Sequence, residues 1–393
     1  MKKTCVTSRG IITPIFKQGD NLAFEIVKSI CEAADEEGFA LHDGDIVGVT
    51  ESVLARTQGN YATVEQITKD IMRKFGGAEI GVVFPIMSRN RFSILLKAFA
   101  KGAEKVYVQL SYPCDEVGNE LISIDYMDEK NVDPYAQNFD EKTFRAVFGY
   151  HTKHRFTGID YIEYYKSLAD NIEIIFSNDP TYVLNYTKNV LSCDIHSRER
   201  TKRRLKAAGA ALVYGMDDIL SESVEGSGYN PEYGLLGSNK ATEEKVKLFP
   251  RDAEIFADEL QKLLLEKTGK RMEVLVYGDG CFKDPVGGIW ELADPVVSPG
   301  FTDRLNGTPN ELKIKYFADN EYSGLTGQEL EEAMKKAIKE KESDLVGNMV
   351  SEGTTPRRYT DLLGSLCDLT SGSGDRGTPV VLVQGYFTNY ATE

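Results

Sequence analysis

Short apolar segments alternate with helical segments through the first part of the chain. IVGVT (46–50) is apolar and rich in β-branched residues, and EIGVVFPI (79–86) and KVYVQLSY (105–112) are also largely apolar. All three segments have the length of strands. Between them, residues 63–75 and 89–101 have the length and composition of helices. Strands that alternate with helices in this way favour an α/β fold in which at least part of a sheet is parallel.

The second half of the chain returns to the same pattern. Residues 251–268 have the spacing of an amphipathic helix, and MEVLVYGDG (272–280) predicts a strand that ends in Gly-Asp-Gly. Long helices are expected over 326–350 and 359–370, and TPVVLVQGY (378–386) predicts a buried strand. Both halves therefore contribute strands to the expected fold.

Polar and glycine-rich stretches interrupt this alternation. Residues 113–150 are polar and have little periodicity, which predicts an irregular excursion or a small insertion. The stretch 226–241 is rich in Gly and Asn and is predicted to be a loop.

A glycine motif near the end of the chain resembles a dinucleotide fingerprint in letters only. GSGDRG (372–377) follows a predicted helix and precedes a predicted strand, whereas the fingerprint follows a strand and opens a helix. We therefore predict a mixed α/β fold that is not a Rossmann fold. The glycine loop either only turns the chain or lends backbone N–H groups to phosphates.

The acidic composition argues against several classes of partner. The chain has 46 Lys and Arg against 61 Asp and Glu, a formal net charge of -15, which disfavours nonspecific binding to nucleic acid or anionic lipid. It has no run of about 18 apolar residues, so no membrane-spanning helix is expected. The basic N-terminal sequence lacks the apolar region of a signal peptide. Six well-separated cysteines without a CxxC pair favour reduced thiols, and we predict a cytoplasmic protein.

Carboxylates near the predicted strand at 272–280 are candidates for a metal site. Asp279 follows an apolar strand, and the carboxyl ends of strands are where open α/β sheets bind ligands. Asp284 lies five residues further on and could join the same group. Carboxylate oxygens suit Mg²⁺ or Mn²⁺, although an Asp between two glycines is also an ordinary turn residue.

A hydroxyl and a guanidinium follow the predicted strand at 46–50. Ser52 and Arg56 are four residues apart, which places them on one side of a helical turn, directly after Glu51. An Arg with a hydroxyl can hold a phosphate group. The alternative is a helix cap with a surface Arg.

One strongly basic run, HSRERTKRRLKAAGA (196–210), has two interpretations. It is predicted to be a solvated helix face, and contact with a polyanion is the alternative. The run lacks the interleaved aromatic residues on which bases stack, and the net charge also disfavours nucleic acid. Asp217 and Asp218 follow a predicted strand and suit a helix cap or turn better than a metal site.

Five blocks of sequence carry a resemblance to one known family. In chain order they are TPIFKQGDNL (13–22), DGDIVGVTESVLARTQGN (43–60), GLLGSNKATEEKVKLFPRDAE (234–254), VLVYGDGCFKDP (274–285) and TDLLGSLCDLTSGSGDRGTPVVLVQGY (360–386). Each block is similar to a sequence segment of the coenzyme F-420:L-glutamate ligase family, and the blocks occur in the same order as in that family.

This resemblance implies a fold, a reaction and a set of site residues. The fold would be a two-part γ-glutamyl-ligase-like α/β fold, with parts at 1–112 and 226–393 and an inserted or extended region at 113–225. The reaction would form an amide bond between glutamate and a carboxylate-bearing acceptor through an acyl phosphate. It would use GTP or ATP with two divalent ions, Mg²⁺ or Mn²⁺, in a homodimer. The implied nucleotide-binding residues are Thr13, Pro14, Ser52, Arg56, Asn239, Gly372, Gly374 and Gly377, and the implied metal-binding residues are Asp279, Asp284 and Ser373.

The chain departs from the family pattern at metal-binding positions. Leu236 stands at the place of a metal-binding Asp, Gly280 at that of a Thr, and Ser373 at that of a metal-contacting polar residue. The metal site could therefore be remodelled, lost, or supplied by Glu51, Asp217 or Asp284. A nucleotide- or metabolite-binding protein that has lost catalysis is the alternative function.

Overall fold

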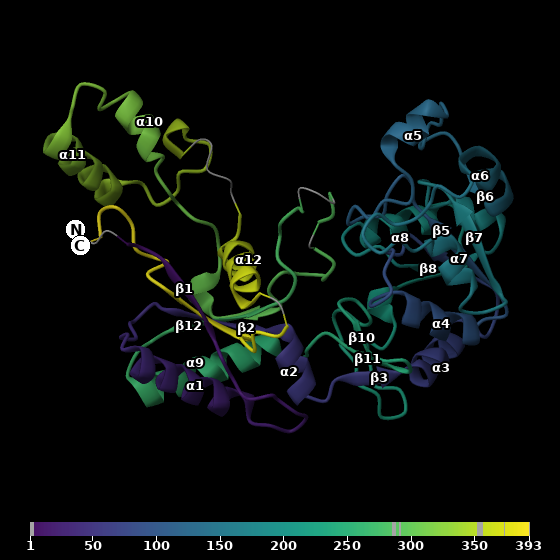
Figure 1. Cartoon of the computed structure of the whole chain (residues 1–393), viewed down its shortest axis with the longest axis horizontal. Helices are drawn as coiled ribbons and strands as arrows, with labels where there is room; N and C mark the ends of the chain where they lie inside the picture. Colours follow the sequence, from purple (N-terminus) through teal and green to yellow (C-terminus); the bar gives the residue numbers. More distant parts are fainter. Residues whose placement is uncertain (1–3, 285–287, 291, 352–356, 373, 393) are drawn as a thin grey trace.

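The protein is built from two lobes, which lie side by side in Figure 1. The computed structural model describes residues 4–284, 288–290, 292–351, 357–372 and 374–392. We call the described residues of 4–60, 250–306 and 357–392 the terminal lobe, because they come from both ends of the chain. Residues 61–249 form the central lobe, and residues 307–351 form a helical extension.

The terminal lobe is organised around a five-stranded sheet. Its strands are β1 (Thr7–Ile11), β2 (Ile46–Thr50), β12 (Glu273–Tyr277), β13 (Gly300–Phe301) and β14 (Val380–Gln384). Their spatial order is β1-β14-β2-β12-β13. β2 and β12 run parallel, and the other neighbouring pairs are antiparallel. β14, the last described strand in the chain, therefore lies between β1 and β2.

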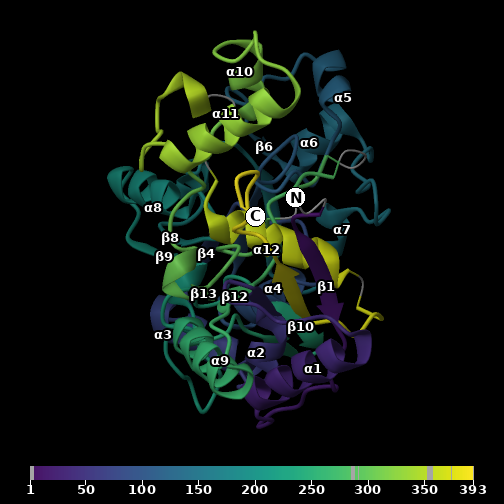
Figure 2. The same ribbon diagram turned by 90° about the vertical axis from the view of Figure 1, so that its left-hand side faces the viewer.

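Helices cover both faces of this sheet. The helices α1 (Leu22–Glu37) and α9 (Ala253–Thr268) pack on one face, and α12 (Tyr359–Ser371) packs on the other (Figure 2). Alternate strand residues point to the two sides, so that Val47 and Val49 face α1 and α9 while Ile46 lies with α12. Because both faces are buried, the strands read as continuous apolar runs in the sequence.

The central lobe holds a six-stranded sheet. Its strands are β4 (Ile80–Val83), β5 (Val106–Leu110), β6 (Phe139–Asp140), β7 (Ile172–Phe176), β8 (Asn189–Ser192) and β9 (Leu212–Gly215). The order is β6-β7-β5-β4-β8-β9, and all neighbours are parallel except β6 and β7. Its helices are α3 (Val64–Phe75), α4 (Ser93–Lys101), α5 (Ile124–Glu129), α6 (Glu141–Phe148), α7 (Tyr161–Lys166) and α8 (Arg198–Ala207).

Smaller elements complete the two lobes. A three-stranded antiparallel sheet in the order β10-β11-β3 lies where the lobes meet (Figure 1). The strands of this sheet are β3 (Tyr61–Thr63), β10 (Asn239–Thr242) and β11 (Lys245–Lys247). The remaining helices are α2 (Glu51–Thr57), α10 (Ile314–Asp319) and α11 (Gly327–Glu340), with 3-10 turns η1 (Tyr182–Asn185), η2 (Met216–Asp218), η3 (Asp303–Leu305) and η4 (Met349–Ser351).

The predicted mixed α/β fold without a Rossmann layout is confirmed. The strand predicted at 46–50 is β2, and the helix predicted at 63–75 is α3. Among the described residues, no helix is long and apolar enough to cross a membrane. The division at residues 112 and 225 stays a prediction. In the six-stranded sheet, β4 and β5 precede residue 112 and the other four strands follow it.

Three local predictions were correct only in part. Residues 113–150 are not wholly irregular, because they contain α5, β6 and α6, and α6 starts at a capping box formed by Asp140 and Thr143. The predicted loop at 226–241 reaches into β10. The helix predicted over 326–350 ends at Glu340, and residues 341–350 lie outside it.

Candidate active site

Two parallel strands bring separate segments together at one edge of the terminal-lobe sheet. β2 and β12 are neighbours in register, with Thr50 opposite Tyr277. Glu51 follows directly after Thr50 and begins α2, and Asp279 comes two residues after Tyr277. The carboxyl ends of two neighbouring strands therefore place these carboxylates at the same edge, where open α/β sheets bind ligands.

Arg91 of the central lobe reaches this edge and joins two aspartates. Its two terminal nitrogens lie 2.7 Å from an oxygen of Asp279 and 2.7 Å from an oxygen of Asp294. The second oxygen of Asp294 accepts a hydrogen bond from the backbone N–H of Asp279, 2.8 Å away. The Asp294 side chain is only 2% exposed, so the pair is held in a largely dry environment.

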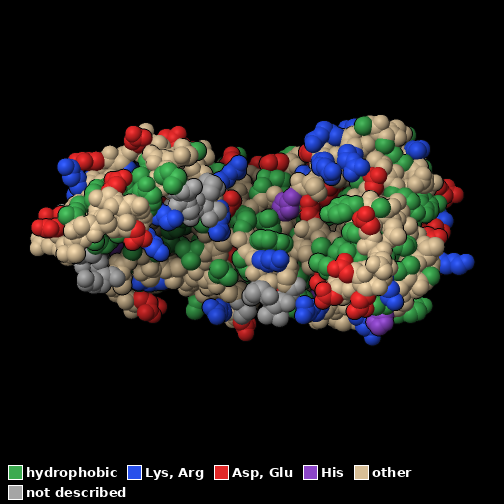
Figure 3. All heavy atoms as spheres, turned by 90° about the horizontal axis from the view of Figure 1, so that it is seen from above, with side chains coloured by type: hydrophobic (Ala, Val, Ile, Leu, Met, Phe, Trp, Pro, Cys, Tyr) green, Lys and Arg blue, Asp and Glu red, His purple; other side chains and the backbone are tan. Residues whose placement is uncertain are grey.

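Lys247 of β11 forms the second ion pair of the site. Its ammonium nitrogen lies 2.6 and 2.7 Å from the two carboxylate oxygens of Glu51. Both side chains are buried. We call Glu51, Arg91, Lys247, Asp279 and Asp294 the charged cluster. The three carboxylates come from the terminal lobe and the two cations from the central lobe, and Figure 3 shows charged side chains of both signs at the surface between the lobes.

The cluster carries more negative than positive charge, and this affects the pKa of its carboxyls. Burial raises the pKa of Asp279, and the charge of Asp294 raises it further, while Arg91 lowers it. Burial likewise raises the pKa of Glu51 against the lowering influence of Lys247. Burial alone would lower the pKa of Arg91, but Asp294 and Asp279 raise it above its ordinary value, so the guanidinium stays charged.

The loop after β12 is held in place by α12 and by a required glycine. Asp368 of α12 accepts a hydrogen bond from the backbone N–H of Gly280, 3.0 Å away. A Cβ atom at Gly278 would stand 2.3 Å from an oxygen of Asp294. The absence of a side chain at Gly278 therefore leaves room for the Asp294 carboxylate against the strand end.

A hollow of 360 Å³ adjoins the charged cluster. We call it the glycine hollow, because the loop between α12 and β14 forms one wall. Thr50, Tyr277 and Asp368 line it and connect it to the edge that bears the cluster. Six of the eight predicted nucleotide-binding residues line this hollow: Thr13, Pro14, Arg56, Gly372, Gly374 and Gly377.

The other predicted site residues lie elsewhere. Ser52 is exposed on α2 and does not line the glycine hollow. Asn239 of β10 pairs in register with Lys247 and so lies beside the charged cluster. Asp284 lies in the loop after β12 and is not one of the cluster side chains, and Ser373 falls outside the described residues.

The basic run forms α8, and aspartates engage several of its cations. Asp217 lies 3.0 Å from Arg198 and 3.1 Å from Lys202, and Asp218 lies 3.0 Å from Lys202. Asp218 also accepts a hydrogen bond from the backbone N–H of Gly215. Asp217 and Asp218 therefore pair with two of the six cations of α8, Arg198 and Lys202.

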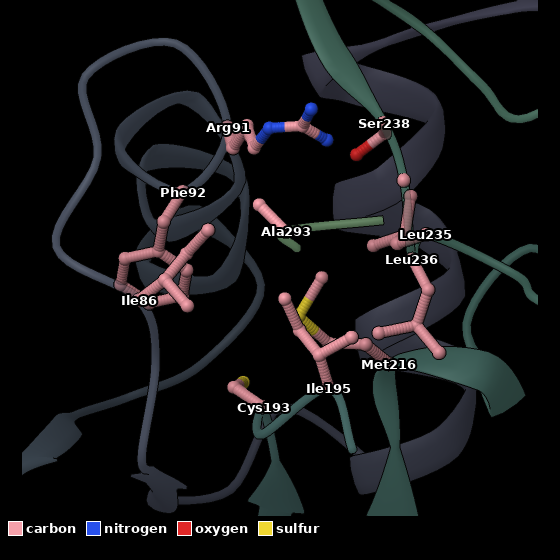
Figure 4. A pocket seen from close by; sticks show the side chains of 11 residues that line it. Ile86, Arg91, Phe92, Cys193, Ile195, Met216, Leu235, Leu236, Ser238 and Ala293 are labelled. Atoms are coloured by element: carbon pink, nitrogen blue, oxygen red, sulfur yellow. The ribbon is translucent and has the colours of Figure 1, made fainter. Parts of the chain in front are cut away.

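A small apolar hollow lies on the central-lobe side of Arg91. Figure 4 shows Arg91 and Ser238 at one end and apolar side chains beyond them. Its volume is 20 Å³, about enough room for one water molecule. Leu236, which stands at the place of a family Asp, lines this hollow and is buried.

The charged cluster as arranged does not fit the divalent ions that the resemblance implies. Carboxylate oxygens are suitable ligands for Mg²⁺ and Mn²⁺. Here, however, Lys247 engages both oxygens of Glu51, and Arg91 engages Asp279 and Asp294. Within the described ranges, no group of three or more His, Cys, Asp or Glu side chains could hold a metal ion.

Four residues at this edge were not predicted from the sequence: Arg91, Lys247, Asp294 and Asp368. Arg91 lies in the segment that follows the buried strand β4. Ligands bind at the carboxyl ends of strands in open α/β sheets, and this rule, which indicated Asp279, also applies to the segment after β4. Lys247 lies on a short strand that was not predicted, and Asp294 lies in a loop rich in Gly and Pro. No local pattern marks these two residues.

Comparison with known proteins agrees with the ordered blocks in the sequence. No curated protein matches the chain at a significant level. A family model described as F420-0:Gamma-glutamyl ligase matches residues 10–385, which is nearly the whole chain and includes both lobes. The chain therefore belongs to the F420-0:gamma-glutamyl ligase family, a family of amide-forming ligases.

Proposed function

We propose that the protein uses a nucleoside triphosphate to join glutamate, or a similar amino acid, to a carboxylate-bearing small molecule. Membership of a γ-glutamyl ligase family supports amide formation. One observation carries the nucleotide part of the proposal. Thr13, Pro14, Arg56 and the glycine loop meet around one hollow beside the charged cluster, although they come from three distant segments.

The proposed reaction has two steps. A carboxylate oxygen of the acceptor attacks the terminal phosphorus of GTP or ATP, the bond to the nucleoside diphosphate breaks, and an acyl phosphate forms. The amine nitrogen of glutamate then attacks the acyl carbon, phosphate leaves, and the amine gives up a proton to water. Backbone N–H groups of the glycine loop and the guanidinium of Arg56 would hold the phosphates in the glycine hollow.

The metal ion and the oligomeric state belong to this proposal as well. Mg²⁺ or Mn²⁺ stays a prediction as a companion of the nucleotide, and we assign no step to it because the charged cluster is already occupied by Arg91 and Lys247. A homodimer is proposed from the resemblance. Light scattering on the purified protein would distinguish a dimer from a monomer.

The first test is a thermal-shift titration with GTP and with ATP, each with and without Mg²⁺ or Mn²⁺. A ligand that binds only the folded state at a hundredfold excess over Kd adds about 2.7 kcal/mol to stability. We expect one nucleotide to raise the melting temperature. Arg56→Gln should reduce that shift, whereas Arg200→Gln, at an exposed position on α8, should leave it unchanged.

A second measurement separates the ligase from a binding protein. Phosphate release should depend on glutamate in the presence of a panel of small carboxylates. Nucleotide binding without phosphate release for any acceptor would favour the alternative, a binding protein on the same scaffold. The absence of a shift with either nucleotide, whether without metal, with Mg²⁺ or with Mn²⁺, would overturn the assignment of the glycine hollow.

A further inference from the structure

The charged cluster is formed across the junction of the two lobes. Its three carboxylates belong to the terminal lobe, where Glu51 and Asp279 follow strand ends and Asp294 lies in a loop, and its two cations belong to the central lobe. Each of the three carboxylates therefore has a positively charged partner at 2.6–2.7 Å that is supplied by the protein itself. The carboxylates of Glu51 and Asp294 are buried, and burying a carboxylate without a cation is strongly unfavourable. The pairing therefore favours the contact between the lobes.

The backbone around Arg91 is fixed by hydrogen bonds. The Ser88 hydroxyl accepts hydrogen bonds from the backbone N–H groups of Asn90 and Arg91, at 3.2 and 3.0 Å. The backbone N–H of Ser88 in turn donates to the hydroxyl of Tyr165, 3.0 Å away. This turn presents the guanidinium to Asp279 and Asp294.

On its other side, Arg91 borders the small apolar hollow, and no carboxylate lines that hollow. That lining combines Arg91 and Ser238 with side chains that carry no charge: Ile86, Phe92, Cys193, Ile195, Met216, Leu235, Leu236 and Ala293. The Arg91 side chain is 17% exposed, so a move into the apolar hollow would cost the hydrogen bonds of a largely buried charge. The positive charge is therefore held at the carboxylates.

We propose that Arg91 and Lys247 are the resident cations of the charged cluster, and that Arg91 keeps divalent metal ions out of it. Arg91 engages one oxygen of Asp279 and one of Asp294, and the second Asp294 oxygen accepts the backbone N–H of Asp279. A metal ion that binds both carboxylates would therefore compete with the guanidinium. It could bind there only after the guanidinium leaves a buried, bidentate position. This inference concerns the same site as the proposed function, but it does not depend on nucleotide binding. The exclusion of metal ions and the proposed ligase function can therefore fail independently of each other.

Binding of Mn²⁺ alone tests this inference. Free Mn²⁺ is measured by electron paramagnetic resonance in titrations of the full chain without nucleotide. Wild type should bind Mn²⁺ weakly, and Arg91→Gln should bind it at least tenfold more tightly. Asp279→Asn in the Arg91→Gln background should remove the gained binding, because it takes away one of the freed carboxylates.

Two control variants separate charge from general disturbance. Arg91→Lys keeps a positive charge at the cluster and should bind Mn²⁺ as weakly as wild type. Arg89→Gln changes an exposed arginine two residues away and should also behave as wild type. Circular dichroism and melting curves report whether each variant is folded.

The same titrations contain the results that contradict the inference. Tight Mn²⁺ binding by wild type that is lost in Asp279→Asn would show that Arg91 does not exclude the ion. A folded Arg91→Gln variant that binds no more Mn²⁺ than wild type would also overturn it. The wild-type and Asp279→Asn measurements can still overturn the inference where Arg91→Gln does not fold.

Discussion

At the scale of single residues, the pairing of Glu51 with Lys247 has a direct consequence for stability. Both side chains are less than 10% exposed, so removal of one charge leaves the other buried without a partner. We expect Lys247→Met to lower the free energy of unfolding by about 3–5 kcal/mol, measured by urea denaturation. The double variant Glu51→Gln/Lys247→Met should regain much of that loss. A double variant as unstable as the single one would show that the loss does not come from an unpaired Glu51 carboxylate.

Asp115 provides a residue-scale prediction about pH. Its carboxylate is buried and accepts hydrogen bonds from the backbone N–H groups of Met87, Val117 and Asn119 and from the Asn119 side chain. Burial raises the pKa of Asp115 to about 6, and these hydrogen bonds only partly oppose that rise. The native state therefore binds a proton at a higher pH than the unfolded chain does.

The sign of the pH effect follows from this raised pKa. The stabilising contribution is fully present below the unfolded pKa near 4 and is lost as the pH rises through 6. Between pH 7 and pH 5, wild type should gain about 1 kcal/mol relative to Asp115→Asn, which cannot titrate. Urea denaturation of both proteins at the two pH values checks this, and parallel pH profiles would contradict it.

At the scale of elements, the contact between β13 and α9 depends on one glycine. A Cβ atom at Gly300 would lie 2.2 Å from the backbone carbon of Ala253, where α9 begins, and backbone atoms cannot rotate out of the way. We expect Gly300→Ala to lower stability by about 1–3 kcal/mol or more, seen as a lower melting temperature. Gly324→Ala is the matched control, because nothing lies within 4 Å of the added atom.

At the scale of the whole molecule, the helical extension is the part least tied to the cores. None of the four apolar core clusters found among the described residues includes a residue of 307–351. Within this segment only Phe317, Met334 and Leu345 are buried apolar residues. Segments with few buried apolar contacts open most easily.

This difference predicts the order of proteolysis. Brief digestion with trypsin should cut the segment 307–351 before it cuts either lobe, and mass spectrometry of the early fragments would locate the sites. First cuts inside the six-stranded or five-stranded sheet would contradict this view of the molecule.

The sequence predicted individual elements better than their partners. Buried strands such as β2 and β12 are recognised in the sequence as apolar β-branched runs. Asp279 was predicted as a site residue because it follows the carboxyl end of such a strand. The neighbours of β2 could not be predicted, because β14 and β12 come from more than 200 residues away. The charged cluster was missed for the same reason. Arg91, Lys247 and Asp294 meet only because the two lobes are placed side by side. No periodic pattern in the sequence indicates that placement.

The position of β14 has a consequence for synthesis on the ribosome. Because β14 lies between β1 and β2, the five-stranded sheet stays open until residues 380–384 have emerged, long after both neighbours. The central lobe, whose strands all lie within residues 61–249, can form while translation is still under way. During that interval the nascent chain would expose the unpaired edges of β1 and β2, which can pair with other chains. We therefore expect chaperones to bind the nascent chain mainly in this period.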